Sequence, residues 1–309
     1  MRPTQQIIFD KLNETRHTTC EAQQLDIFQN TPTTQPAVEY WHYSDLHNLF
    51  GELDFPTNPH PHKAQSHTWE CIYTPKKTPN TTDAKNTLYQ QHAQTTEHSF
   101  FLNGTHFKKA QDLKLSRYAC WCLSRNNPSL TFARTYFLAP VLMETPTLKK
   151  LHDYTYQFSR IHLRETLKQY ERNLSGILNK YHADFSRFNH STTMAFFYGY
   201  SAKDLKERYN IPALSNDPIA NYMGAASLYA RIVALATTIN RFNASTTKNA
   251  DTIYSILNQE LINQRVQMLK NYGIAPEQDI YKTSAAKVQS KLKAAEKQFI
   301  AKYKDQKLR

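Results

Sequence analysis

The stretch LKLSRYACWCLSRNNPSLTFARTYF, residues 113–137, combines apolar, aromatic and arginine positions in a regular pattern, and we refer to it as the signature segment. At about 100° per residue, its first half predicts an α-helix with two neighbouring faces. One face holds Leu115, Tyr118, Ala119 and Cys122, and the other holds Lys114, Arg117, Trp121, Ser124 and Arg125. The first face suits packing against other elements, and the second suits contact with anions.

A turn is predicted directly after this helix. Asn126 and Asn127 hydrogen-bond readily to local backbone, and Pro128 disfavours the helical conformation of the residue before it. Ser129 or Thr131 can begin the next helix. The signature segment is therefore predicted to form two consecutive helices.

The signature segment resembles part of the DNA-damage-inducible protein D family. The match falls on Leu115, Ser116, Arg117, Tyr118, Ala119 and Cys120, followed by Thr135, Tyr136 and Phe137. Further motifs in similar order are Asp184-Phe185-x-x-Phe188, Phe197-Tyr198-Gly199 and Met223-Gly224 leading to Leu228-x-Ala230. The resemblance extends, with gaps, over residues 38–280. It departs from the family at the short connection 126–128 and in the helix after Met223, which lacks the family's later Arg and Gln.

This resemblance implies an amino-terminal half similar to the Bro-N domain of phage and viral proteins. It also implies a non-enzymatic, cytoplasmic and nucleoid-associated accessory protein of the bacterial DNA-damage (SOS) response. Such a protein would modulate recombination by binding DNA, expected to be single-stranded, or the RecA recombinase filament, or both. One alternative is a Bro-like phage-type regulator or antirepressor that acts through duplex DNA or a repressor partner. A second alternative is a nuclease, which the scattered carboxylates of this chain disfavour.

Charge is distributed unevenly along the chain. Residues 1–110 hold nine Lys and Arg against eleven Asp and Glu, which gives a net charge of −2. The remainder holds 29 against 15 and carries +14. Because clustered Lys and Arg gain affinity for phosphates by releasing counterions, this imbalance favours a polyanion-binding region, nucleic acid before membrane. The alternative is a basic protein whose charge serves solubility alone.

The predicted fold is α+β and predominantly helical: a small Bro-N-like α+β domain, then a helical domain and a basic helical tail. Strands are expected at 38–42 and 100–103, and well-patterned helices at 223–239 and 252–271. The expected divisions are an arm (1–36), a Bro-N-like domain (37–142) with a polar loop (54–99), a helical domain (143–280) and the tail (281–309).

The basic face of the signature segment is the first candidate for nucleic-acid binding. Arginine presents forked donors suited to phosphate, and Trp121 can stack on an unpaired base. The candidate residues are Lys108, Lys109, Lys114, Arg117, Trp121, Arg125 and Arg134. In the alternative interpretation Trp121 is buried, Arg117 pairs with a carboxylate and the lysines are merely solvated.

The tail, residues 282–309, is the second candidate, because it holds nine Lys and Arg against two acidic residues. Its expected helix has a narrow apolar stripe made of Ala285, Val288, Leu292, Ala295, Phe299 and Tyr303. The lysines expected to meet phosphates are Lys287, Lys291, Lys293 and Lys297. A solvated, fraying helix and a coiled-coil-like contact between two copies are the alternatives.

No pattern points to catalysis or to a cofactor. The chain has no Gly-x-Ser-x-Gly elbow, no phosphate-binding P-loop and no His-Glu-x-x-His. His60, His62, His67 and Cys71 match no common zinc spacing, so we expect a His-rich loop and no metal. The expected partners are single-stranded DNA, a recombinase filament, or both, with a homo-oligomer left open and no membrane or small-molecule substrate.

The compartment is predicted from two further observations. No run approaches the roughly 20 apolar residues of a membrane helix, and MRPTQQIIFDKL lacks the apolar core of a secretory signal. Four cysteines in 309 residues fit a reducing compartment better than a disulfide framework. We therefore expect a soluble, cytoplasmic protein with reduced cysteines.

Overall fold

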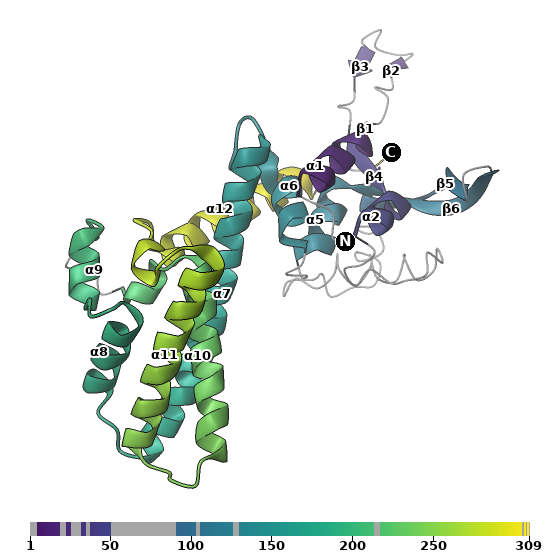
Figure 1. Cartoon of the computed structure of the whole chain (residues 1–309). Helices are drawn as coiled ribbons and strands as arrows, with labels where there is room; N and C mark the ends of the chain where they lie inside the picture. The colour runs from purple at the N-terminus through teal and green to yellow at the C-terminus, as the bar shows by residue number, and fades with distance from the viewer. Residues whose placement is uncertain are drawn as a thin grey trace. The chain divides into compact units, whose positions relative to one another are not determined.

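The computed structural model describes residues 5–18, 23–25, 32–34, 38–50, 91–102, 106–125, 130–212, 217–304, 306 and 308. It is α+β and predominantly helical, as predicted (Figure 1). The chain forms two compact units: unit 1 comprises residues 1–155 and 292–309, and unit 2 comprises residues 156–291. The sequence had suggested a division near residue 142 and a separate tail after residue 280.

Unit 1 contains a four-stranded antiparallel sheet in the order β1-β4-β6-β5. Its strands are β1 (His17–Thr18), β4 (Glu39–His42), β6 (His106–Ser116) and β5 (Ala93–Leu102). β2 (Gln23–Leu25) and β3 (Pro32–Thr34) pair separately. In its described residues, unit 1 also contains α1 (Gln5–Glu14), α2 (Tyr43–Phe50), α5 (Arg117–Arg125) and α6 (Thr131–Leu142).

β5 and β6 form a long two-stranded ribbon. Their pairing runs from Ala93 opposite Leu115 to Leu102 opposite His106. β4 pairs only with the last three residues of β6, 114–116, so most of the ribbon extends past the other strands of this sheet (Figure 1). The expected strand at 100–103 therefore begins earlier, at Ala93, within the stretch assigned to a polar loop. Residues 54–90 of that loop lie outside the described residues.

The start of the signature segment is strand rather than helix, which corrects the predicted helix from residue 113. Leu113 and Leu115 are buried, and Lys114 between them is partly exposed. This alternation has the period of a strand, and both leucines pair across to β5. Ser116 then ends the strand and caps α5, since its Oγ accepts a 3.2 Å hydrogen bond from the backbone N of Ala119. The second predicted helix is confirmed as α6, which begins at Thr131.

Unit 2 is helical. It contains α8 (Phe185–Phe196), α9 (Ala202–Arg208), α10 (Ala225–Ala244) and α11 (Ala250–Tyr272). Two short 3-10 helices, η2 (Ile219–Asn221) and η3 (Pro276–Gln278), also belong to it. Two helices contribute to both units, α7 (Leu148–Lys180) and α12 (Ala285–Tyr303). Within unit 2, α11 packs against α8 and α10 (Figure 1). The core of unit 2 is formed by buried leucine and phenylalanine side chains such as Leu167, Leu174, Phe196, Leu228 and Leu257.

The ends of α11 follow from its local sequence. The Asn249 side chain accepts a hydrogen bond from the backbone N of Thr252 at the start. Gly273 ends the helix with a φ of 64°, a left-handed conformation that glycine adopts without strain. The predicted helix at 252–271 is thereby confirmed. The helix predicted at 223–239 is also confirmed as α10, with Ala230 and Ala234 buried as expected of small packing residues.

Arg160 of α7 joins distant segments of unit 2. Its side chain is fully buried, and its donors reach the backbone carbonyls of Met223 at 2.7 Å, Asn221 at 2.8 Å and Thr283 at 2.9 Å. The guanidinium also lies 4.7 Å from the centre of the Tyr281 ring. Burial lowers the pKa of Arg160, but a guanidinium still stays charged at neutral pH. One buried cation therefore fixes α7 to the segments that precede α10 and α12.

Gly224 makes the adjoining contact at the start of α10. Its backbone N donates to the Asp279 carbonyl at 2.7 Å, and the Asp279 carboxylate accepts from Ser227 N at 2.9 Å. A Cβ at Gly224 would lie only 1.8 Å from Asp279 Oδ1. Glycine is required here by this close approach, since its φ of −75° is open to any residue.

Replacing Gly224 with alanine is expected to lower the free energy of unfolding by about 1–3 kcal/mol, because the Asp279 carboxylate must leave its place at the helix start. Gly176 of α7 is the matched control, because it has no neighbouring atom within 4 Å of an added Cβ. Gly176→Ala should be neutral or should stabilise by up to about 1 kcal/mol. Urea unfolding followed by circular dichroism measures both, and equal effects would contradict the proposed role of Gly224.

Candidate nucleic-acid interface

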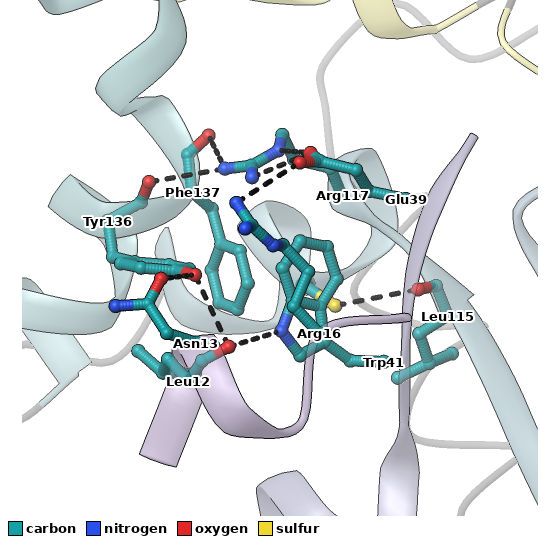
Figure 2. Close-up of polar contacts among 10 residues, drawn as sticks. Leu12, Asn13, Arg16, Glu39, Trp41, Leu115, Arg117, Tyr136 and Phe137 are labelled. Atoms are coloured by element: carbon teal, nitrogen blue, oxygen red, sulfur yellow. Dashed lines mark hydrogen bonds and ion pairs between the residues drawn. The ribbon is translucent and has the colours of Figure 1, made fainter. Parts of the chain in front are cut away.

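Arg117, the first residue of α5, is buried in unit 1 and bound on several sides (Figure 2). Its Nε and Nη2 both lie 2.7 Å from Glu39 Oε2 on β4. Its Nη1 donates to the backbone carbonyls of Tyr136 and Phe137 on α6, each at 3.3 Å. The alternative in which Arg117 pairs with a carboxylate is confirmed, and the prediction of a phosphate-facing Arg117 does not fit this burial.

Two aromatic rings lie beside the same guanidinium, and both are hydrogen-bonded to α1. The centre of the guanidinium lies 5.0 Å from the Trp41 ring and 5.7 Å from the Tyr136 ring. Trp41 Nε1 and the Tyr136 hydroxyl in turn donate to the Leu12 carbonyl at 3.0 and 3.2 Å (Figure 2). Burial raises the pKa of Tyr136 to about 12, so this hydroxyl remains a donor at neutral pH. Arg117 thus organises the core of unit 1.

Trp121 is also a core residue, 2% exposed. Its ring lies 5.3 Å from that of Phe299 on α12 and 6.0 Å from that of Tyr118. Its indole Nε1 has no hydrogen-bond partner among the described residues. A base cannot stack on a ring that is covered in this way, so the prediction of Trp121 as a stacking platform is corrected. The arginine and tryptophan face of α5 failed as a surface prediction because all residues from Arg117 to Ser124 are buried.

The other residues predicted together with the signature segment are spread over β6, α5 and α6. Arg134 pairs with Glu296 of α12, and Arg125 lies 5.2 Å from the Trp121 ring. Lys114 lies 5.0 Å from the Tyr40 ring. Lys108 and Lys109 lie on the ribbon, opposite Phe100 and Ser99. Six residues of strand separate Lys108 from Lys114, which corresponds to about 20 Å.

α12 carries the exposed positive charge that the tail pattern predicted. Ala285, Leu292, Ala295 and Phe299 are buried and Val288 and Tyr303 are partly buried, so the predicted apolar stripe is confirmed. The lysines that flank this stripe are exposed: Lys287, Lys291, Lys293, Lys297 and Lys302. Glu296, the one acidic residue of this helix, pairs with Arg134. The helix therefore presents lysines without an exposed carboxylate of its own.

The chain after α12 is anchored in unit 1. His92 Nε2 lies 2.6 Å from the Lys304 carbonyl, and His92 Nδ1 lies 2.8 Å from Ser116 Oγ. The backbone N of Leu308 donates to the Gln91 carbonyl at 2.8 Å, and the Leu308 side chain is buried. The sequence did not indicate His92, because its partners lie 24 and 212 residues away. This anchoring differs from the fraying helix considered above.

The cysteine and histidine predictions are tested only in part. Cys120 and Cys122 are buried and form no disulfide, and burial raises the pKa of the Cys120 thiol well above its usual range. Cys20, Cys71, His60, His62 and His67 lie outside the described residues. Within the described part of the chain, no group of three or more His, Cys, Asp or Glu could hold a metal ion.

Comparison with known proteins gives no relative. No family model matches the chain, and no curated protein or solved structure matches it either. In the described ranges, no helix combines the length and the apolar character needed to cross a bilayer.

Replacing Arg117 with methionine is expected to lower the free energy of unfolding by about 2–4 kcal/mol, because Glu39 loses its closest donor and two carbonyls lose the donor that Arg117 supplies. Arg16 is the matched control: it approaches the same carboxylate, at 3.5 Å, but its side chain is 45% exposed. Arg16→Met should cost no more than about 1 kcal/mol. Chemical unfolding measures both, and a surface-like effect of Arg117→Met would overturn its assignment to the core.

Proposed function

We propose that this protein binds nucleic acid through the exposed lysines of α12, as a non-enzymatic accessory protein of the DNA-damage response. The observation that supports this most directly is the charge of α12, whose lysines are exposed while its one glutamate is paired. Such a helix attracts phosphates and gains affinity by releasing their counterions. The apolar stripe of α12 packs within the chain, so the helix is held in place while its lysines face solvent.

The ribbon adds a second element that suits nucleic acid. Lys108 and Lys109 are adjacent on β6, in the part of the ribbon that β4 does not pair with. A two-stranded ribbon fits the major groove of duplex DNA. We propose that Lys108 and Lys109 contribute less to nucleic-acid binding than the lysines of α12 do.

A contact with a protein partner is proposed for α11. Ile262, Val266 and Leu269 are 44%, 53% and 43% exposed, and their spacing places them on one face of this helix. We refer to these three residues as the α11 stripe. Arg265 lies on α11 as well, and its guanidinium is 5.0 Å from the ring of Tyr198, a residue that follows α8 and is 77% exposed. Exposed apolar residues that adjoin one another favour a protein contact, and the resemblance to the DNA-damage-inducible protein D family suggests the recombinase filament.

The lysine proposal is tested by fluorescence anisotropy with single-stranded DNA, duplex DNA and RNA at low and physiological salt. Lys287, Lys291, Lys293 and Lys297 are replaced together with glutamine. The expected result is weaker binding to single-stranded DNA and a salt dependence whose slope falls by about 2–3, since each phosphate contact contributes about 0.7. The matched control replaces four exposed lysines elsewhere, Lys149, Lys180, Lys203 and Lys270, and should retain most of the affinity.

Two outcomes would contradict this assignment. Equal losses in the two fourfold variants would show that binding follows net charge and has no defined site. Tight binding to one duplex sequence, with a defined oligomer, would favour the Bro-like regulator.

The partner proposal has its own variant, Val266→Asp, which places a charge in the α11 stripe. This change is expected to weaken binding to a recombinase filament at least tenfold and to leave affinity for bare single-stranded DNA unchanged. Asn263→Asp, an exposed position on the same helix outside the stripe, adds the same charge as the control. Pull-down on filaments assembled on immobilised DNA measures binding, and equal losses for both variants would reject the stripe as the contact.

A further inference from the structure

Unit 2 contains a cavity of about 510 Å³ that the proposed nucleic-acid binding does not use. It lies among α7, α8, α10 and α11. Much of its wall is apolar and is formed by Leu174, Phe188, Leu235, Leu257 and Leu261. The volume falls within the range of about 300–1,000 Å³ that is usual for small-molecule sites.

Among the described residues, three charged side chains lie in the wall of this cavity: Arg164 and Glu171 of α7 and Arg231 of α10. Arg164 is satisfied, because its Nε donates to Asn221 Oδ1 at 2.8 Å and its Nη1 to Glu171 Oε2 at 3.0 Å. Arg231 is not. Its Nη2 lies 3.8 Å from Glu171 Oε1, which is too long for a hydrogen bond, and its buried Nε has no hydrogen-bond partner among the described residues.

The charge in the wall is therefore unbalanced, with two guanidinium groups and one carboxylate. The side chain of Arg231 is only 13% exposed, and burial lowers its pKa. An unsatisfied buried donor is costly, and natural proteins rarely retain one without a partner. Two more deeply buried arginines of unit 2, Arg160 and Arg164, donate to carbonyl, amide or carboxylate oxygens, which sets Arg231 apart.

We propose that this cavity binds a small organic carboxylate with an apolar body. Arginine presents a planar fork of donors that matches the two oxygens of a carboxylate. Arg231 would donate hydrogen bonds to the carboxylate of the ligand. The leucine and phenylalanine side chains of the wall would pack against the apolar part of the ligand. An apolar wall of this extent favours such a ligand over a free inorganic anion. Nothing in this binding depends on the lysines of α12.

The proposal is tested by isothermal titration calorimetry of the full chain with octanoate and with octanamide, its neutral analogue of similar shape. Octanoate is expected to bind at one site and at least tenfold more tightly than octanamide. Arg231→Met should reduce octanoate affinity at least tenfold and remove the preference for octanoate. Arg172→Met is the matched control, because Arg172 is exposed on α7 and does not line the cavity; it should change neither affinity.

A second variant keeps the test decisive if Arg231→Met does not fold. Ala202 lines the cavity and is only partly buried, so Ala202→Phe fills the space without removing a charge. It should weaken binding of octanoate and octanamide alike. Equal affinity for octanoate and octanamide in the unmodified protein, no saturable binding of octanoate, or tighter binding of inorganic phosphate than of octanoate would each overturn the proposal.

Discussion

A buried guanidinium needs an acceptor for each of its donors, and this requirement organises both units. In unit 1, Arg117 draws β4 and α6 together through Glu39 and two carbonyls. In unit 2, Arg160 joins α7 to the segments before α10 and α12 through three carbonyls. Arg231 differs, since its side chain is only 13% exposed and its buried Nε has no hydrogen-bond partner among the described residues. The same rule therefore separates arginines that hold the fold from one that we assign to a ligand.

Elements with local causes were predictable from the sequence. The ends of α11 follow from Asn249 and Gly273, which act within one turn, and the apolar stripe of α12 follows from residues three and four apart. The start of the signature segment was not predictable in the same way. Leu115 fits the helical face of Tyr118, Ala119 and Cys122 as well as a strand that alternates with Leu113, and only the pairing with β5 decides between the two.

Only the part of the candidate site that follows from a local sequence pattern was predictable. Exposed lysines on α12 follow from the sequence, because a helix that buries a narrow stripe leaves its remaining positions in solvent. The burial of Arg117 does not, because its acceptor Glu39 lies 78 residues away. Arg134 is likewise bound by Glu296, 162 residues later. Basic residues next to aromatics predicted a phosphate surface, whereas in α5 the aromatics belong to the core and the arginine is bound within it.

We propose that α12, and not the buried helix α5, is the surface for nucleic acid. Hydrogen–deuterium exchange of the full chain, with and without single-stranded DNA, tests this proposal directly. Added DNA should slow exchange in residues 285–303 and leave residues 117–125, already protected by burial, unchanged. Slower exchange confined to residues 117–125, with α12 unaffected, would contradict the proposal.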